Sequence, residues 1–192
     1  KPEDPIFDLC STMLVGTNYH AIQEAEQRSK ELGYNTLVLG SRFSGEAREI
    51  GKVFSGIAQD IILHRTPLCA PACIIAGGET TVTLRGKGKG GRNQEMALSV
   101  LNEFDHFSRS VRPGLERTLF LSAGTDGNDG PTDAAGAFAD VGALENAHRL
   151  GLNPSEFLAN NDSYAFFEEV GGLFVTGPTG TNVCDIQLLI VK

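Results

Sequence analysis

Alternating and clustered apolar positions divide the chain into short strands and amphipathic helices. Apolar runs predict strands at 12–15, 36–39, 73–76, 80–84, 118–121, 173–175 and 186–191. Apolar residues at helical spacing, with capping residues beside them, predict helices over 18–32, 44–62, 93–104 and within 134–150, and two short helices after Pro154 and Asn160. The strand–helix–strand–helix order at the start is typical of a parallel α/β unit.

The link Gly77-Gly78 between the strands at 73–76 and 80–84 is too short for a crossover helix. It predicts a hairpin or bend, so the sheet should contain antiparallel pairing as well. We therefore predict an α/β fold with three layers, α/β/α, and a mixed, mostly parallel sheet. A chain of 192 residues can bury one good-sized core, and we expect residues 1–192 to form a single α/β domain.

Composition narrows the classes of partner. Sixteen Lys and Arg against 24 Asp and Glu give a net charge of −8, which argues against a broad nucleic-acid surface. The sequence has no apolar run of membrane-spanning length and no N-terminal signal pattern, so we expect no membrane partner. The four cysteines show neither C-x-x-C nor zinc spacing, which favours free thiols in a reducing compartment such as the cytoplasm.

A block of glycines and cations, residues 85–92, is the main exception to the acidic composition. It holds four of the 16 Lys and Arg residues and lies between an alternating strand and a helix start. A glycine-rich turn at that position lets backbone N–H groups approach an anion, and Lys87, Lys89 and Arg92 would add positive charge. The block predicts an anion site, most simply for phosphate. The alternative is a flexible surface loop with solvated charges.

Formal phosphate motifs fit this block poorly. The P-loop pattern fails because Arg92-Asn93 replaces its Lys-Ser/Thr pair. Gly86, Gly88 and Gly91 satisfy the dinucleotide pattern G-x-G-x-x-G, but no acid follows at the end of the next strand to bind a ribose.

Residues 122–133 form a second informative loop, directly after the predicted strand 118–121. It carries Asp126, Asp129 and Asp133, and no Lys or Arg occurs between positions 118 and 148. Such a loop could hold Mg²⁺ together with substrate phosphates, although the EF-hand pattern fails. The alternative, equally favoured by this loop alone, is that its Asp and Asn side chains only cap turns.

A third loop, residues 176–182, is rich in glycine and threonine and would suit a substrate carboxylate or phosphate oxygen, or else form a simple hairpin turn. A basic loop, an acidic loop and a hydroxyl-rich loop together favour phosphoryl transfer, which needs a phosphate clamp and a metal more than a covalent nucleophile.

Several motifs in order resemble the C-terminal MOFRL region of the glycerate 2-kinases. They are Gly77-Gly78-Glu79-Thr80, Gly90-Gly91-Arg92-Asn93-Gln94-Glu95, Gly124-Thr125-Asp126-Gly127, Asp129-Gly130-Pro131-Thr132-Asp133-Ala134-Ala135-Gly136, Asn161-Asp162-Ser163-Tyr164 and Thr179-Gly180-Thr181-Asn182-Val183. The resemblance extends from about residue 15 to residue 191. It implies ATP-dependent phosphorylation of D-glycerate to 2-phosphoglycerate, with ATP and Mg²⁺ as cofactors.

The resemblance also implies an organisation in two α/β domains with the active site in the cleft between them. This chain would be the C-terminal domain, and its partner would be the absent N-terminal domain of the same protein. The fragment alone would then be inactive. Members of such a family could form homodimers and be cytoplasmic or mitochondrial.

The resemblance assigns roles by position. Arg92 would stabilise the transferring phosphoryl group or orient glycerate, and Asp126 would be a metal ligand or general base, with Asp129 as a second metal ligand. Residues expected to bind phosphate or substrate are Lys87, Lys89, Gly90, Gly91, Asn93, Glu95, Thr125 and Asn182. From these roles we expect Arg92→Ala to abolish turnover with little change in melting temperature.

Two other functions stay open. Relatives are also described as hydroxypyruvate reductases, which the missing ribose-binding acid does not favour. The domain could also be mainly structural, supplying an interface or a lid.

Overall fold

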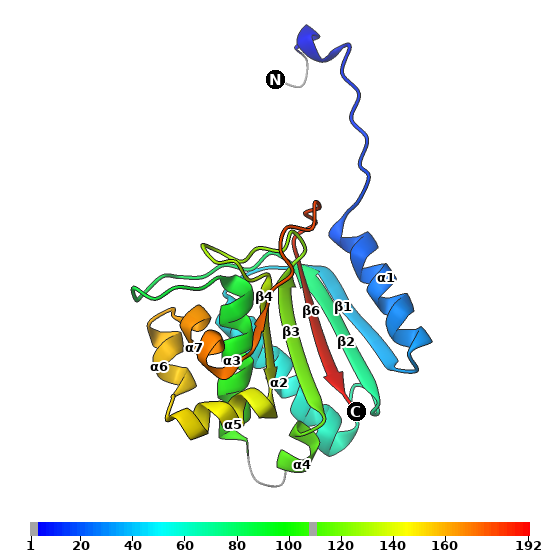
Figure 1. Cartoon of the computed structure of the whole chain (residues 1–192). Helices are drawn as coiled ribbons and strands as arrows, with labels where there is room; N and C mark the ends of the chain where they lie inside the picture. Colours follow the sequence, from blue (N-terminus) through cyan, green and yellow to red (C-terminus); the bar gives the residue numbers. More distant parts are fainter. Residues whose placement is uncertain (1–3, 108–110) are drawn as a thin grey trace.

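In the computed structural model, which describes residues 4–107 and 111–192, one six-stranded sheet lies between helices on its two faces (Figure 1). The strands are β1 (Asn35–Phe43), β2 (Ala72–Gly78), β3 (Thr118–Gly124), β4 (Gly136–Asp140), β5 (Leu173–Phe174) and β6 (Asp185–Val191), in the spatial order β1-β2-β6-β3-β4-β5. The helices are α1 (Asn18–Glu31), α2 (Ala47–His64), α3 (Arg92–His106), α4 (Arg112–Leu115), α5 (Val141–Leu150), α6 (Pro154–Ala159) and α7 (Ser163–Val170), and a 3₁₀ turn, η1, spans Pro5–Phe7.

The α/β class and the mixed sheet are confirmed, but the expectation of a mostly parallel sheet is wrong. Only β1 and β2 pair in parallel, and β2–β6, β6–β3, β3–β4 and β4–β5 are all antiparallel in the described residues. Two of these pairs arise because β6, the last strand, inserts between β2 and β3 and runs opposite to both. These two pairings join segments distant in sequence and leave no signal in the local apolar pattern, and the other two involve β4, which was not predicted.

Two predicted elements differ from the structure, and one strand was not predicted. The run 12–15 is no strand, and its side chains are exposed, Val15 by 89%. The alternating segment 80–84 makes a single bridge, from Thr81 to Glu46, instead of a hairpin with β2. The helix expected within 134–150 is confirmed as α5, which begins at residue 141 because Asp140 caps it by accepting a hydrogen bond from the Ala143 N–H; strand β4, in the first part of that stretch, was not predicted.

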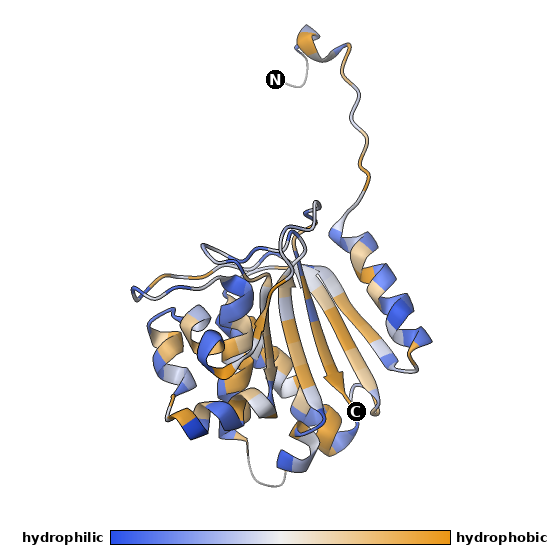
Figure 2. Ribbon diagram, in the orientation of Figure 1, coloured by the Kyte–Doolittle hydropathy of each residue, from blue (hydrophilic) through white to orange (hydrophobic). Residues whose placement is uncertain are grey.

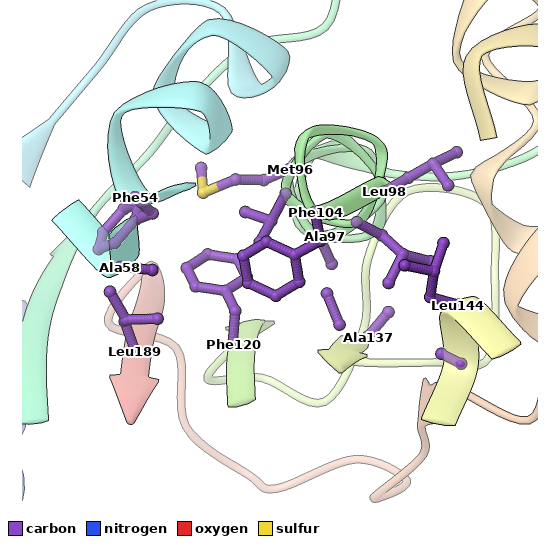
Figure 3. Packing of buried hydrophobic residues seen from close by; sticks show 14 of the residues in the cluster. Phe54, Ala58, Met96, Ala97, Leu98, Phe104, Phe120, Ala137, Leu144 and Leu189 are labelled. Atoms are coloured by element: carbon purple, nitrogen blue, oxygen red, sulfur yellow. The ribbon is translucent and has the colours of Figure 1, made fainter. Parts of the chain in front are cut away.

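The main core lies between the sheet and the α2–α3 layer (Figure 3). Phe54 of α2, Met96 and Phe104 of α3 and Phe120 of β3 are all buried there, and the Phe54 and Phe120 ring centroids are 4.9 Å apart. The hydropathy colouring shows the same division, with apolar residues along the central strands and polar residues on the outer sides of the helices (Figure 2). Burial of these large side chains supplies most of the driving force for folding.

Helix α1 covers the opposite face of the sheet over β1 and β2 (Figure 1). Ile22 of α1 packs against Cys73 and Ile75 of β2 in a second, smaller cluster. Thr17 caps the helix by accepting a hydrogen bond from the His20 N–H. With helices on both faces, the three-layer arrangement is established.

Three strand ends meet at one edge of the sheet. Asp185, the first residue of β6, is the register partner both of Gly78 at the end of β2 and of Gly124 at the end of β3. The loops that follow β2 and β3 and the loop that precedes β6 therefore lie side by side, at the top of Figure 1. These are the three loops that carry the sequence motifs.

Candidate functional site

A groove of about 700 Å³ opens at this edge of the sheet. It lies between the segment that links β2 to α3, the first turn of α3 and the acidic loop after β3. Its lining includes Glu79, Thr80, Val82, Leu84, Gly88, Gly90, Gly91, Arg92, Glu95, Asp129, Pro131 and Asn161. Of the predicted site residues, Gly90, Gly91, Arg92, Glu95 and Asp129 thus lie together around one hollow.

Arg92 is fixed by two carboxylates of very different exposure. Its Nε and Nη2 atoms donate to the two oxygens of Asp185 at 2.6 and 2.9 Å, and the Asp185 side chain is fully buried. Its Nη1 atom lies 3.2 Å from Glu79, whose side chain is 61% exposed. The hydrogen bonds to Asp185 raise the pKa of the guanidinium further above its ordinary value, so Arg92 is a permanent cation. Asp185 thus holds one edge of the guanidinium, and the Nη1 atom pairs with Glu79, which lines the groove together with Arg92.

Asp129 caps α3 from a neighbouring loop. Its two carboxylate oxygens accept hydrogen bonds from the backbone N–H groups of Asn93, at 3.1 Å, and Gln94, at 2.9 Å. Gly91, the residue before the helix, has no side chain to serve as a cap, and a Cβ atom there would collide with the Asp129 carboxylate. Burial raises the pKa of Asp129 to about 6, against the lowering effect of those hydrogen bonds.

This geometry speaks against the metal-ligand role predicted for Asp129. The side chain is only 2% exposed, and both oxygens already serve the start of α3. A negative charge at a helix N-terminus is favourable, so the protein's own carboxylate occupies the place where the sequence suggested a phosphate.

Asp126 lies in the turn after β3, outside the groove lining. Its two oxygens accept from the Asn128 N–H and the Asn182 Nδ2, each at 3.1 Å. Thr125 donates its backbone N–H and its hydroxyl to the carbonyl of Cys184, the neighbour of Asp185. Thr125, Asp126 and Asn182 therefore form one cluster, joined to the Arg92 ion pair through the start of β6.

The basic glycine block is an extended arm rather than an anion-binding turn. Its glycines alternate with cations, so Gly86, Gly88 and Gly90 face one side while Lys87 and Lys89 are exposed on the other. The glycine side lies against the corner between α6 and α7, residues 160–163, where added Cβ atoms would collide.

The backbone N–H groups of residues 85–89 are already used by that corner. They donate to the Asn161 side chain, the Asn160 side chain and carbonyl, and the Asp162 side chain. The amides of residues 85–89 are therefore not free to bind an anion, which corrects that part of the expectation, whereas Gly90 and Gly91 line the groove. Lys89 is itself placed over the Tyr164 ring, with its Nζ atom 4.1 Å from the ring centroid.

The Asn93 and Glu95 side chains are bound to buried protein groups, although Glu95 also borders the groove. The Asn93 side chain is buried between α3 and the sheet, where it accepts from the Ser122 hydroxyl at 2.6 Å. Glu95 is 2% exposed and forms an ion pair with Arg48 of α2. A buried carboxylate would repel a phosphate, so the geometry favours a structural role for Glu95 over the predicted contact with substrate.

Sequence reasoning missed three residues that build this site: Asp185, Arg48 and Asn161. Asp185 had a signal, since Asp185 and Gln187 interrupt the apolar residues on one face of β6 with buried polar groups. A polar residue at a position that should face the core indicates a specific partner. Arg48 had no such signal, because its partner Glu95 is 47 residues away in sequence.

No group of three or more His, Cys, Asp or Glu side chains in the described ranges 4–107 and 111–192 is arranged to hold a metal ion. Asp126 nevertheless fits the needs of Mg²⁺, because each partly exposed oxygen accepts only one hydrogen bond and Mg²⁺ takes most of its ligands from water and phosphates. None of the described helices has the length and apolar character to cross a membrane.

Comparison with known proteins gives consistent matches. The MOFRL family matches residues 72–185. A D-glycerate 2-kinase of Thermotoga maritima is 41% identical over 178 residues, covering 93% of this chain and 41% of the relative. A glycerate kinase of Mus musculus is 36% identical over 219 residues, with coverages of 93% and 41%. The crystal structure of glycerate kinase from Thermotoga maritima aligns with a TM-score of 0.86 at 39% identity, covering 95% of this chain and 42% of that one.

These matches share one pattern of coverage. The chain spans about two fifths of the length of the curated relatives that it matches. The family match includes the whole of β2, the basic arm, α3 and the acidic loop, and ends at Asp185. Because this match covers more than half of the sequence, the chain belongs to the MOFRL family.

Proposed function

We propose that this chain forms part of the active site of a kinase that transfers a phosphoryl group from ATP to D-glycerate and gives 2-phosphoglycerate. The names of its relatives and the likeness to the glycerate kinase structure support the reaction class. Because the chain spans only part of those relatives, the proposal concerns the protein in which this domain acts with a second α/β domain across the groove.

The geometry of Arg92 is the observation that carries the proposal. Phosphoryl transfer is accelerated mainly by positive charge that is already in place where negative charge develops. Asp185 holds the Nε edge of the guanidinium, and the Nη1 atom pairs with Glu79, an exposed side chain that lines the groove together with Arg92. Arg92 would thus offer a preorganised donor to the carboxylate of glycerate or to the transferring phosphoryl group.

Lys87 and Lys89 would attract the anionic substrates. Both are exposed on the outer side of the arm, in a chain whose net charge as a whole is −8. Lys89 is restrained by Tyr164, while the Lys87 side chain forms no hydrogen bond or ion pair with any residue that the structure describes. We therefore assign the direct contact with a phosphate to Lys87.

Asp126 would serve as the metal ligand or as the general base. Mg²⁺ bound there would neutralise charge on the phosphates of ATP. Asn182 and Asn128 hold the carboxylate of Asp126 in one orientation, so its free lone pairs point in a fixed direction. Thr125 anchors this turn to the start of β6 and would keep it at a constant distance from Arg92.

The proposal is tested by incubating the complete protein with D-glycerate and ATP–Mg²⁺ and reading the product by phosphorus NMR. We expect 2-phosphoglycerate, and Lys87→Met should raise KM for an anionic substrate by roughly tenfold, the effect of losing one charged hydrogen bond. Lys30→Met, which removes an exposed cation from α1, is the matched control. A product phosphorylated at the 3-position, or NADH oxidation with hydroxypyruvate in place of phosphorylation, would contradict the proposal.

A mainly structural role is a second candidate. It is favoured by partly buried apolar residues on the face of the sheet that α1 covers. Leu119, Leu121 and Phe138 lie on that face of β3 and β4 and are only partly buried. Isothermal titration calorimetry of this chain with ATP–Mg²⁺ and with D-glycerate separates the two roles. Heat of binding would support a ligand site on this chain, whereas turnover by the complete protein without binding to this chain would support the interface role.

A further inference from the structure

Asn161 stands at the centre of the contacts that hold the basic arm. It lies between α6 and α7, is 4% exposed and has a left-handed backbone with φ of 54°, a conformation that asparagine tolerates better than most residues. Its Oδ1 atom accepts from the backbone N–H groups of Arg85, at 2.7 Å, and Gly86, at 3.0 Å. One side chain thus binds two successive amides at the base of the arm.

The amide nitrogen of Asn161 is bound by a buried residue of α3. Its Nδ2 atom donates to Glu95 Oε2 at 2.8 Å, which fixes which end of the amide faces the arm. Glu95 Oε1 accepts in turn from Arg48, with the Nη2 atom at 2.8 Å and the Nε atom at 2.9 Å. Arg48 also donates to the Leu158 carbonyl at the end of α6. The arm is therefore connected through Asn161 and Glu95 to α2, α3 and α6.

The contacts among Arg48, Glu95 and Asn161 depend on both charge and burial. Glu95 is 2% exposed, and its carboxylate is balanced by the Arg48 cation and the Asn161 amide. Buried polar groups are costly unless they are all paired, so the three side chains support each other's orientation. In this arrangement Glu95 acts on the arm through Asn161.

We propose that Asn161, oriented by Glu95 and Arg48, is the positioning residue that fixes the basic arm at the mouth of the groove. The arm extends over α6 and α7, from which it is gripped (Figure 1). With Gly86 and Gly88 packed against this corner, the arm keeps its Lys87 and Lys89 side chains exposed on the opposite side, while Gly88 and Gly90 also line the groove. The claim that these contacts present Lys87 to an anionic substrate rests on the proposed function. The claim that they fix the arm does not.

Limited trypsin digestion of the complete protein tests the grip without any substrate. Trypsin cleaves after Arg85, Lys87 and Lys89 only when the arm leaves the corner. Asn161→Gly removes the side chain and keeps the left-handed backbone accessible, and we expect it to raise the rate of cleavage in the arm by roughly tenfold or more, as expected for two lost hydrogen bonds. The control is Asn146→Ala, which removes an amide that binds the Val170 carbonyl at the end of α7. Equal cleavage rates in both variants and the parent protein would overturn the proposal.

A pair of substitutions that moves the negative charge from residue 95 to residue 161 separates a positioning role of Asn161 from a general loss of stability. Asn161→Asp would place two carboxylates against each other, and adding Glu95→Gln would restore a donor–acceptor pair with the opposite polarity. We expect fast cleavage in the arm for Asn161→Asp and a return toward the parent rate in the double variant. No rescue, with both variants folded by circular dichroism, would overturn the assignment of Glu95 as the partner that orients Asn161.

Kinetics test the last step of the proposal. In Asn161→Gly, we expect KM for an anionic substrate to rise by roughly tenfold with kcat changed less, because the arm must be reordered on binding. Faster cleavage with unchanged KM would overturn the claim that the fixed arm presents Lys87 to the substrate. It would still support the claim that Asn161 fixes the arm. If the complete protein phosphorylates no glycerate, the proposed function fails, and the digestion still decides on the grip.

Discussion

Asp185 holds Arg92 through two hydrogen bonds, Oδ2 to Nε at 2.6 Å and Oδ1 to Nη2 at 2.9 Å, at the point where β2, β6 and β3 reach the edge of the sheet. The same guanidinium lies 3.2 Å from Glu79. One arginine therefore has a fully buried partner and a largely exposed one, and the two ion pairs should differ strongly in their contribution to stability.

We predict that Asp185→Asn lowers the free energy of unfolding by about 3 kcal/mol, because it leaves a partly buried cation without its main partner. Glu79→Gln should change it by less than about 0.5 kcal/mol, since an exposed pair gains little over solvation by water. Urea denaturation of the two variants measures both values. Similar losses in the two variants would mean that burial does not separate the partners of Arg92.

The same geometry corrects an expectation from the sequence. Arg92→Ala was expected to stop turnover with little change in melting temperature. Because Asp185 is fully buried, removal of Arg92 leaves an unpaired carboxylate in the core, and this variant should unfold at a lower temperature as well. Loss of activity in Arg92→Ala is therefore informative only together with a melting curve.

Much of the fold could be predicted from local patterns. The apolar runs at 36–39, 73–76, 118–121 and 186–191 are strands, and apolar residues at helical spacing located α2 and α3. What could not be predicted is the order of the strands. The pairing of β6 with both β2 and β3 joins segments more than 60 residues apart in sequence, and no local rule of periodicity contains that information.

The site could be predicted only in part, because its contacts also join residues that are distant in sequence. The basic block and the acidic loop are at one edge, as expected, but the use of each side chain depends on a distant partner. Asp129 in an Asp-rich loop looks like a metal ligand, and only its hydrogen bonds to the start of α3 identify it as a cap. The glycines of the arm likewise serve close packing on the α6–α7 corner, because Gly86 and Gly88 have no room for a side chain there.

Asp129 gives a prediction with a defined sign in pH. Burial raises its pKa in the folded protein to about 6, from an ordinary value of 3.8. Between these values the folded state holds a proton that the unfolded state releases. The contribution of Asp129 to the free energy of unfolding is therefore greatest below pH 3.8 and is lost as the pH rises through about 6, by at most about 3 kcal/mol.

Urea denaturation between pH 4 and pH 7 checks this prediction, with Asp129→Asn as the reference that cannot titrate. The free energy of unfolding of the parent protein, relative to that of the variant, should increase as the pH falls. The opposite slope would mean that the hydrogen bonds from Asn93 and Gln94 outweigh the cost of burial and keep the carboxylate ionised.

Two glycines with contrasting surroundings test the packing of the basic arm. A Cβ atom at Gly86 would overlap the Asn160 carbonyl, so Gly86→Ala should force the arm away from its corner and cost about 1–3 kcal/mol of stability. Gly56 lies on the exposed side of α2, and a Cβ atom there meets nothing within 4 Å. Gly56→Ala should therefore stabilise the protein by roughly 0.5–1 kcal/mol, since alanine is the better helix former.

Thermal melts of the two variants measure these opposite shifts, and trypsin digestion locates the first of them. Only Gly86→Ala should expose the bonds after Lys87 and Lys89, because only that substitution places a Cβ atom against the Asn160 backbone at the α6–α7 corner. A stabilising Gly86→Ala would require the arm to lie away from Asn160 in solution. The close approach that explains the alternation of glycine and cation would then be lost, and the flexible, solvated loop would be the better description of residues 85–91.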